Sequence, residues 1–127
     1  MLYEKLDRGV VFQDAGERIL AANPAAEKIL GFDEEKLLGH TFGDLQLKSL
    51  KKESSIEDKE NSILVTRIFN SQKGVDLWIK ARWEPILRQG DGTPHAFCIF
   101  LEDITERKRI EQELKEKFLA VELEREI

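Results

Sequence analysis

The chain has 127 residues, 41% of them hydrophobic and 35% charged, with a formal net charge of −5 at pH 7. This composition fits one domain with a hydrophobic core, and the acidic balance gives no electrostatic reason to expect nucleic acid as a partner. The single cysteine excludes an internal disulfide and favours a cytoplasmic location. No apolar run approaches the roughly 20 residues of a membrane span, so we expect no direct membrane insertion. A membrane anchor elsewhere in a longer parent protein stays open.

Hydrophobic periodicity and turn residues predict nine elements along the chain. In chain order they are strands at residues 9–14 and 18–22, helices at 24–30, 33–39 and 44–52, strands at 62–69, 76–86 and 95–101, and a helix at 106–127. The first helix has the clearest boundaries. Asn23 is a strong N-cap, Pro24 suits the first helical position, and Gly31 is expected to end the helix.

The order of these elements predicts the fold class. Short turns, at residues 14–16, at Gly74 and at residues 90–94, join consecutive strands, which implies antiparallel pairing. The helices cluster between the second and third strands, which implies that they cover one face of the sheet. We therefore expect an α+β domain.

The junction at residues 103–108 joins the last strand to a long charged helix. Asp103 and Thr105 supply side-chain oxygens suited to cap the first free amides of that helix, and Glu106 adds negative charge to its first turn. Residues 106–127 contain no glycine or proline. Such a junction passes a change in the sheet directly into the helix, which suggests a signal output.

Three segments together resemble the PAS domain, a sensor module of signalling proteins. Residues 23–32 resemble the stretch after the second strand of the family, residues 77–86 its fourth strand, and residues 103–108 its closing PAC motif. The resemblance implies a five-stranded antiparallel sheet with short helices on one face, a pocket between them and a C-terminal signalling helix. It also implies use in histidine kinases of two-component systems, in cyclase-type enzymes or in transcription regulators.

The resemblance divides the chain into three parts. Residues 1–8 are an N-terminal flanking segment, residues 9–105 the PAS sensor domain, and residues 106–127 a C-terminal signalling or coiled-coil helix. It also suggests that Asp103 pairs with Arg107, so we expect Asp103, Thr105 and Arg107 to form the signal relay.

Period-two alternation, compared with the family, assigns a set of side chains to the face toward the helices. The candidate pocket residues are Val11, Gln13, Phe69, Ile79, Ala81, Trp83, Phe97, Ile99 and Leu101. A well-filled core without a ligand is an equal alternative. A bound ligand would be mostly apolar, with Gln13 and Arg67 as its polar handles. The direction of Arg67 stays open, because turn chemistry does not fix the register of its strand.

The candidates for cofactor and metal chemistry are two histidines and one cysteine. Cys98 lies in mid-strand. Flavin-binding light sensors of the family carry their cysteine after the second helix instead, in the segment that here consists of residues 40–44 and contains no cysteine. Neither His40 nor His95 lies on the later helix that holds the haem ligand of oxygen-sensing members. We expect no metal site, no catalytic residue and no enzyme activity, and the pattern argues against haem and flavin.

Two apolar surfaces predict a homodimer. Trp78, Cys98 and Phe100 share the outer face of the sheet, where the N-terminal segment or a second copy would cover them. The terminal helix carries an apolar stripe of helical period, which favours a parallel coiled coil over packing on its own sheet. The stripe consists of Ile110, Leu114, Phe118 and Val121.

These observations predict a sensor and dimerisation module that detects a small molecule or a partner. The terminal helix would relay its state to a C-terminal effector domain of the parent protein. The alternative is a ligand-free module that only holds two copies together, and a weaker alternative is a haem or flavin sensor of redox state or gas.

Overall fold

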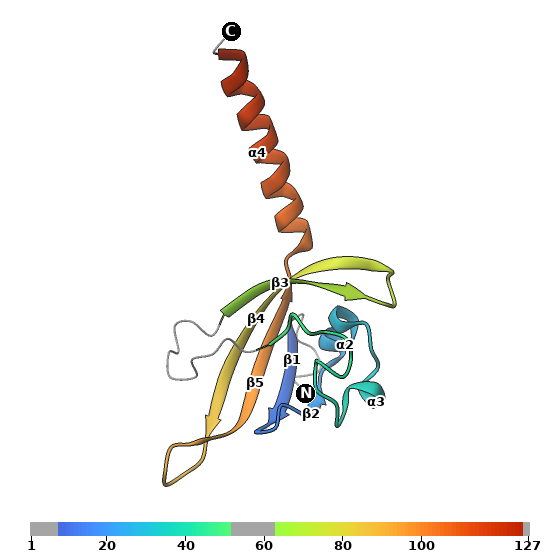
Figure 1. Cartoon of the computed structure of the whole chain (residues 1–127), viewed down its shortest axis with the longest axis vertical. Coiled ribbons are helices and arrows are strands. Elements are labelled where there is room, and N and C mark those ends of the chain that lie inside the picture. The colour runs from blue at the N-terminus through green and yellow to red at the C-terminus, as the bar shows by residue number, and fades with distance from the viewer. Residues whose placement is uncertain (1–7, 52–62, 126–127) are drawn as a thin grey trace.

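The computed structural model describes residues 8–51 and 63–125, which form a five-stranded antiparallel sheet, short helices on one face and a long terminal helix (Figure 1). The elements are β1 Gly9–Asp14, β2 Ile19–Ala22, α2 Pro24–Leu30, α3 Glu34–Leu37, β3 Ile63–Asn70, β4 Val75–Leu87, β5 Pro94–Asp103 and α4 Thr105–Arg125. The predicted α+β class and five-stranded sheet are confirmed.

The strand that leads into the terminal helix lies at the centre of the sheet. The strand order is β2-β1-β5-β4-β3, and β5 pairs antiparallel with both β1 and β4. Ile99 faces Val11 on one neighbour and Trp83 on the other, so these three side chains share the inner face. A movement of the inner face therefore acts on the strand that continues into α4.

Asn23 starts α2 and fastens it to the first strand. Its Oδ1 accepts hydrogen bonds from the amides of Ala26 and Val10, both at 2.9 Å, and its Nδ2 donates to the Arg8 carbonyl. The side chain is fully buried. The predicted cap is therefore confirmed, and it also performs a long-range task, because Val10 and Arg8 lie outside the helix.

Asn70 holds the other end of α2. Its Nδ2 donates to the carbonyls of Lys28 and Ile29 at 2.7 and 3.1 Å, and its Oδ1 accepts from the Lys73 amide. Gly31 ends the helix at φ +81°, where a Cβ would lie 2.7 Å from Asn70 Oδ1. Only glycine satisfies both the left-handed backbone and this close approach.

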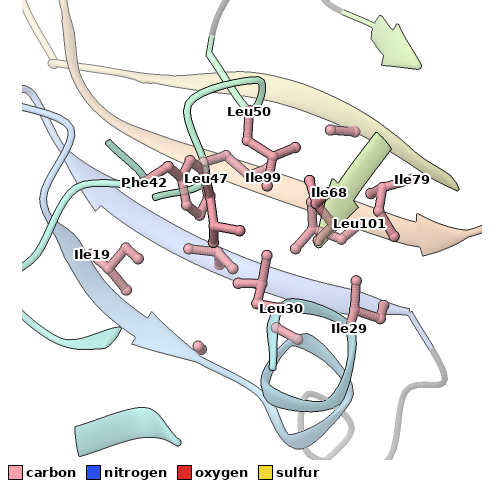
Figure 2. Packing of buried hydrophobic residues seen from close by; sticks show 14 of the residues in the cluster. Ile19, Ile29, Leu30, Phe42, Leu47, Leu50, Ile68, Ile79, Ile99 and Leu101 are labelled. Atoms are coloured by element: carbon pink, nitrogen blue, oxygen red, sulfur yellow. The ribbon is translucent and has the colours of Figure 1, made fainter. Parts of the chain in front are cut away.

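The core lies between the inner face of the sheet and the covering segments (Figure 2). Ile29 and Leu30 come from α2, and Phe42 and Leu47 come from the segment after α3, all pointing toward the strands. Every predicted inward residue of β4 and β5 is buried. These are Ile79, Ala81, Trp83, Phe97, Ile99 and Leu101.

The predicted helix at residues 44–52 is wrong over its described part. Residues 42–46 and 48–49 form turns, Gln46 has φ +64°, and the Leu47 amide donates to the Phe42 carbonyl at 2.8 Å. The cause is local. The Thr41 hydroxyl accepts from the Asp44 amide, while the Asp44 carboxylate accepts from the Thr41 amide. These bonds give the backbone an alternative to helix.

Phe69 is the predicted pocket residue that the structure contradicts. Its side chain is 53% exposed, and its neighbour Ile68 is buried at 4%. Because side chains alternate along a strand, one residue of register decides which of the two faces the core. Arg67 shares the outer face with Phe69, so it is not a polar handle of the pocket.

α4 leaves the end of β5 and projects away from the sheet (Figure 1). It begins at Thr105, one residue before the predicted start. The side chains of residues 109–121 are exposed. No helix in the described part of the chain is long and apolar enough to cross a membrane.

Candidate functional site

A cavity of about 330 Å³ opens beneath residues 41–51 at one end of the sheet. Three regions build its walls: the start of the sheet with the β1–β2 turn, the segment after α3, and β4. The lining residues are Gln13, Glu17, Thr41, Phe42, Gly43, Lys48, Leu50, Lys51 and Trp83. Of the predicted pocket residues, Gln13 and Trp83 line this cavity.

Gln13 is the polar group at the inner side of this cavity. It is 2% exposed, and its carboxamide has no hydrogen-bond partner within residues 8–51 and 63–125. A buried amide without a partner costs about 1–3 kcal/mol of folding free energy. A polar side chain kept buried at this expense in a cavity wall indicates that something else completes its hydrogen bonds.

Charged groups of both signs lie at the rim. Lys48 and Lys51 are exposed and come from the segment after α3. Glu17 comes from the β1–β2 turn, where it has φ +67° and its amide donates to the Asp14 carbonyl at 3.0 Å. The rim therefore carries two positive charges and one negative charge, which come from different segments of the chain.

Thr41 and Asp44 fix the shape of the covering segment. A hydrogen bond from the Thr41 amide, at 3.1 Å from Asp44 Oδ2, holds the pKa of the Asp44 carboxyl below its ordinary value. The carboxylate is therefore charged at neutral pH and keeps accepting from Thr41. The Thr41 oxygen in turn accepts from the Asp44 amide, so each of the two residues holds the other in this turn.

The other predicted pocket residues lie deeper than the cavity. Five of them, Val11, Ala81, Ile79, Ile99 and Leu101, have 0% exposure, and Phe97 has 4%. Their side chains pack against one another in the core. Their role in binding a ligand stays a prediction.

Sequence reasoning missed the wall that the segment after α3 supplies. Thr41, Phe42, Lys48, Leu50 and Lys51 reach the cavity because the segment folds back over the sheet. Leu47 and Leu50 are buried at 3% and 2%. A helix with buried leucines three residues apart gives the same sequence pattern, so only the Thr41 and Asp44 side chains signalled a turn.

The Thr105 side chain joins the start of α4 to strand β4 of the sheet. Thr105 Oγ1 accepts from the Trp78 amide at 2.9 Å and donates to Asp103 Oδ1 at 2.5 Å. Asp103 Oδ1 also accepts from the Thr105 amide, and the Ile104 amide donates to the Trp78 carbonyl at 2.8 Å. The first turn of the helix is therefore tied to β4 through both backbone groups of Trp78.

This arrangement corrects two expectations about the relay. Asp103 binds the first amide of α4 as predicted, but the Thr105 hydroxyl binds a strand amide and not a helix amide. Over the described residues, no ion pair joins Asp103 to Arg107. The resemblance suggested that pair, and the Thr105 hydroxyl takes the place beside Asp103 instead.

Trp78 is enclosed by cations from two other elements. The Arg67 guanidinium lies 5.3 Å and the Lys108 ammonium 5.4 Å from the centre of its ring. Both distances are within the range of cation–π attraction. Trp78 therefore links β3, β4 and the first turn of α4 on the outer face.

The rest of the predicted dimer surface is only partly bare. Phe100 is half-buried, with the Arg82 guanidinium 5.0 Å from its ring centre. Cys98 is also half-buried, and burial raises the pKa of its thiol. On α4, the exposed fractions of Ile110, Leu114, Phe118 and Val121 range from 44% to 65%. The predicted N-terminal cover at residues 1–7 lies outside the described residues.

The histidines are at the surface of the described chain. His40 Nδ1 lies 3.8 Å from Asp44 Oδ2, and both side chains are about half exposed. No group of three histidine, cysteine, aspartate or glutamate side chains gathers at one place in the segments that the structure describes.

A family model for the PAS domain matches residues 7–106. The chain is similar in structure to an RNA-binding light-oxygen-voltage receptor, with 22% identity and a TM-score of 0.71, covering 94% of this chain and 35% of the receptor. It thus spans about a third of that receptor.

Two further solved structures are covered almost whole. A PAS domain from Colwellia psychrerythraea shares 19% identity at a TM-score of 0.64, with coverage of 82% of this chain and 92% of that one. A sensory box histidine kinase/response regulator from Burkholderia thailandensis shares 20% identity at a TM-score of 0.63, with coverage of 95% and 92%. Likeness at these identities shows the fold.

Proposed function

Because the chain belongs to the PAS domain family of sensor and signalling modules, we propose that it binds a small molecule in the cavity beneath residues 41–51 and relays its occupancy through α4. The relay acts on a C-terminal effector domain of the parent protein, a histidine kinase being one such effector. The module itself is not an enzyme, works as a homodimer and resides in the cytoplasm.

The observation that carries this proposal is that one strand serves both the cavity and the helix start. Trp83 of β4 lines the cavity on the inner face, and Trp78 of the same strand holds Thr105 and Ile104 through its backbone. Five residues of strand span about 17 Å. A ligand that tilts or shifts β4 at Trp83 therefore changes the hydrogen bonds that hold the start of α4 at Trp78.

A ligand-free dimerisation module is the second candidate. The inner core is closely packed, with five of the predicted pocket residues at 0% exposure. The apolar stripe on α4 is exposed in one copy of the chain, as a helix that pairs with a second copy requires. In this case the cavity is only a feature of the covering segment.

NMR titration with a library of small-molecule fragments tests the proposal against this alternative. We expect fragments that shift the amides of Gln13 and Trp83 also to shift those of Thr105 and Glu106. Fragments that move the cavity amides alone would contradict the relay. A library without any fragment that binds at the cavity would favour the ligand-free module.

The haem or flavin alternative has its own test. Both groups absorb visible light, so we expect the purified protein to be colourless. A visible absorption band that stays with the protein through purification would replace the proposed ligand with a resident cofactor.

A further inference from the structure

We infer, building on the proposed sensor function, that the cavity takes a small organic monocarboxylate with an apolar body. The Gln13 carboxamide would hydrogen-bond to the carboxylate end, Lys48 and Lys51 would attract its charge, and the apolar wall would cover the body. The apolar wall consists of Phe42, Leu50 and Trp83.

The first step of the argument is the unmet hydrogen-bonding capacity of Gln13. The residue is 98% buried (2% exposed) and lines the cavity, and its carboxamide lacks a partner anywhere in the described chain. A ligand with a polar end satisfies the carboxamide and fills the apolar space beside it.

The second step is the charge at the rim, which selects the sign of the ligand. Lys48 and Lys51 face one negative group, Glu17, so the lining carries a net positive charge. The β1–β2 turn holds the backbone around Glu17 in place, because Asp14 Oδ1 accepts from the amides of Gly16 and Arg18 at 2.9 and 3.0 Å. A carboxylate at the rim repels ligands with two negative charges more than ligands with one.

The third step separates a carboxylate from a phosphate. Lysines bind phosphate as point charges, whereas phosphate sites with defined geometry add arginine forks or helix N-termini. The described lining contains neither an arginine nor the first turn of a helix. The cavity volume of about 330 Å³ lies at the small end of the range of ligand pockets, about 300–1,000 Å³, so the ligand is small.

Three probes with one ring and different end groups test the charge preference: phenylacetate, phenylacetamide and phenethylamine. Each is titrated into the intact chain and followed by NMR at the cavity amides. We expect phenylacetate to bind about tenfold more tightly than phenylacetamide, and phenethylamine to bind least. Raising the salt concentration should weaken only phenylacetate, because salt screens exposed charges.

Two double variants test whether Lys48 and Lys51 cause the preference for phenylacetate. Lys48→Gln combined with Lys51→Gln should abolish the difference between phenylacetate and phenylacetamide. Lys28→Gln combined with Lys36→Gln, at exposed positions of α2 and α3 outside the lining, is the matched control and should retain it. Both pairs change only exposed side chains, so the fold is preserved.

Gln13→Leu tests the hydrogen-bonding step without reference to a particular ligand. The variant should lose at least half of its shifts with phenylacetate and should unfold at a higher temperature than the parent chain, since a partnerless buried amide is removed. An unchanged or lower unfolding temperature together with unchanged phenylacetate binding would overturn the role of Gln13.

The outcomes separate this inference from the proposed function. If phenylacetamide or phenethylamine binds at the cavity as tightly as phenylacetate, the carboxylate inference is wrong and the sensor function stands. If none of the three probes shifts the cavity amides, the inference is also wrong. The fragment library described above then decides independently whether the cavity binds any ligand.

Discussion

Replacing Thr105 by valine removes the hydroxyl that joins α4 to the sheet and keeps the shape of the side chain. Two hydrogen bonds are lost, one from the Trp78 amide at 2.9 Å and one to Asp103 Oδ1 at 2.5 Å. Valine is β-branched like threonine, so packing around Cβ is preserved. The variant therefore isolates the polar link between strand and helix.

The two bonds differ in what their loss does. Asp103 is exposed, so water replaces the donor and the carboxylate loses little. The Trp78 amide is in a part-buried bond, and an unmet donor in such a place costs about 1–3 kcal/mol. We expect a local loss of about 1–2 kcal/mol at the junction, which corresponds to a factor of about 5–30 in the local opening equilibrium.

Amide hydrogen exchange, measured residue by residue, reports this change in the local opening equilibrium. We expect protection of the Trp78 and Lys108 amides to fall by about that factor, because the Lys108 amide bonds to Ile104 at the same junction. Protection at Ile99 should stay unchanged. Thr105→Ser keeps the hydroxyl and should resemble the parent chain. Equal losses at the junction and at Ile99 would show that the motif clamps the whole fold, and the relay reasoning would be refuted.

Three further outcomes are expected. Gly31→Ala should lower the free energy of unfolding by about 2–4 kcal/mol in urea titrations, because the new Cβ would lie 2.7 Å from the Asn70 carboxamide oxygen. Gly39→Ala is the control: its φ is +79° but the space around it is open, so it should lose only about 1–2 kcal/mol. Equal losses in the two variants would contradict the clash at Gly31. Leu114→Glu combined with Phe118→Glu should convert a dimer into a monomer in light scattering at about 100 μM with an unchanged sheet signal, and a monomeric parent chain would end the dimer proposal. Burial raises the pKa of the Cys98 thiol, so the folded state holds this proton more strongly, and the stability of the fold falls as the pH rises past the ordinary thiol pKa. Iodoacetamide should therefore react more slowly with the folded chain than with free glutathione at pH 8. An equal rate would contradict the raised pKa.

The sequence predicted those elements whose boundaries are set by local chemistry. Asn23 and Pro24 start α2, and Gly31 ends it, as expected from their backbone preferences. The inner face of β4 also follows from alternation, because Lys80 and Arg82 point away from Ile79 and Ala81. Both faces of β5 are apolar, and there the resemblance to the family decided which face is the inner one. These features depend on neighbours within a few residues, and a single sequence contains that information.

The wrong predictions concern residues whose direction or contacts are set by residues far away in the sequence. Phe69 was assigned inward because β3 carries apolar residues on both faces, and its register is set by the buried carboxamide of Asn70 at its end. The Thr105 hydroxyl finds the Trp78 amide, 27 positions away, and no local pattern announces that contact. The cavity wall at residues 41–51 was missed for the same reason.

Strand β3 forms one edge of the sheet, and its outward residues Ile63, Val65 and Phe69 are 43–53% exposed. Such an edge is a template for intermolecular strand addition and aggregation. Two side chains counter it. Arg67 places a charge within the apolar row, and the Ser49 hydroxyl donates to the Arg67 carbonyl at 2.9 Å, occupying an acceptor that a foreign strand would use. Arg67 thus protects solubility at this edge. Its replacement would lower the yield of monodisperse protein at high concentration more than it lowers the free energy of unfolding.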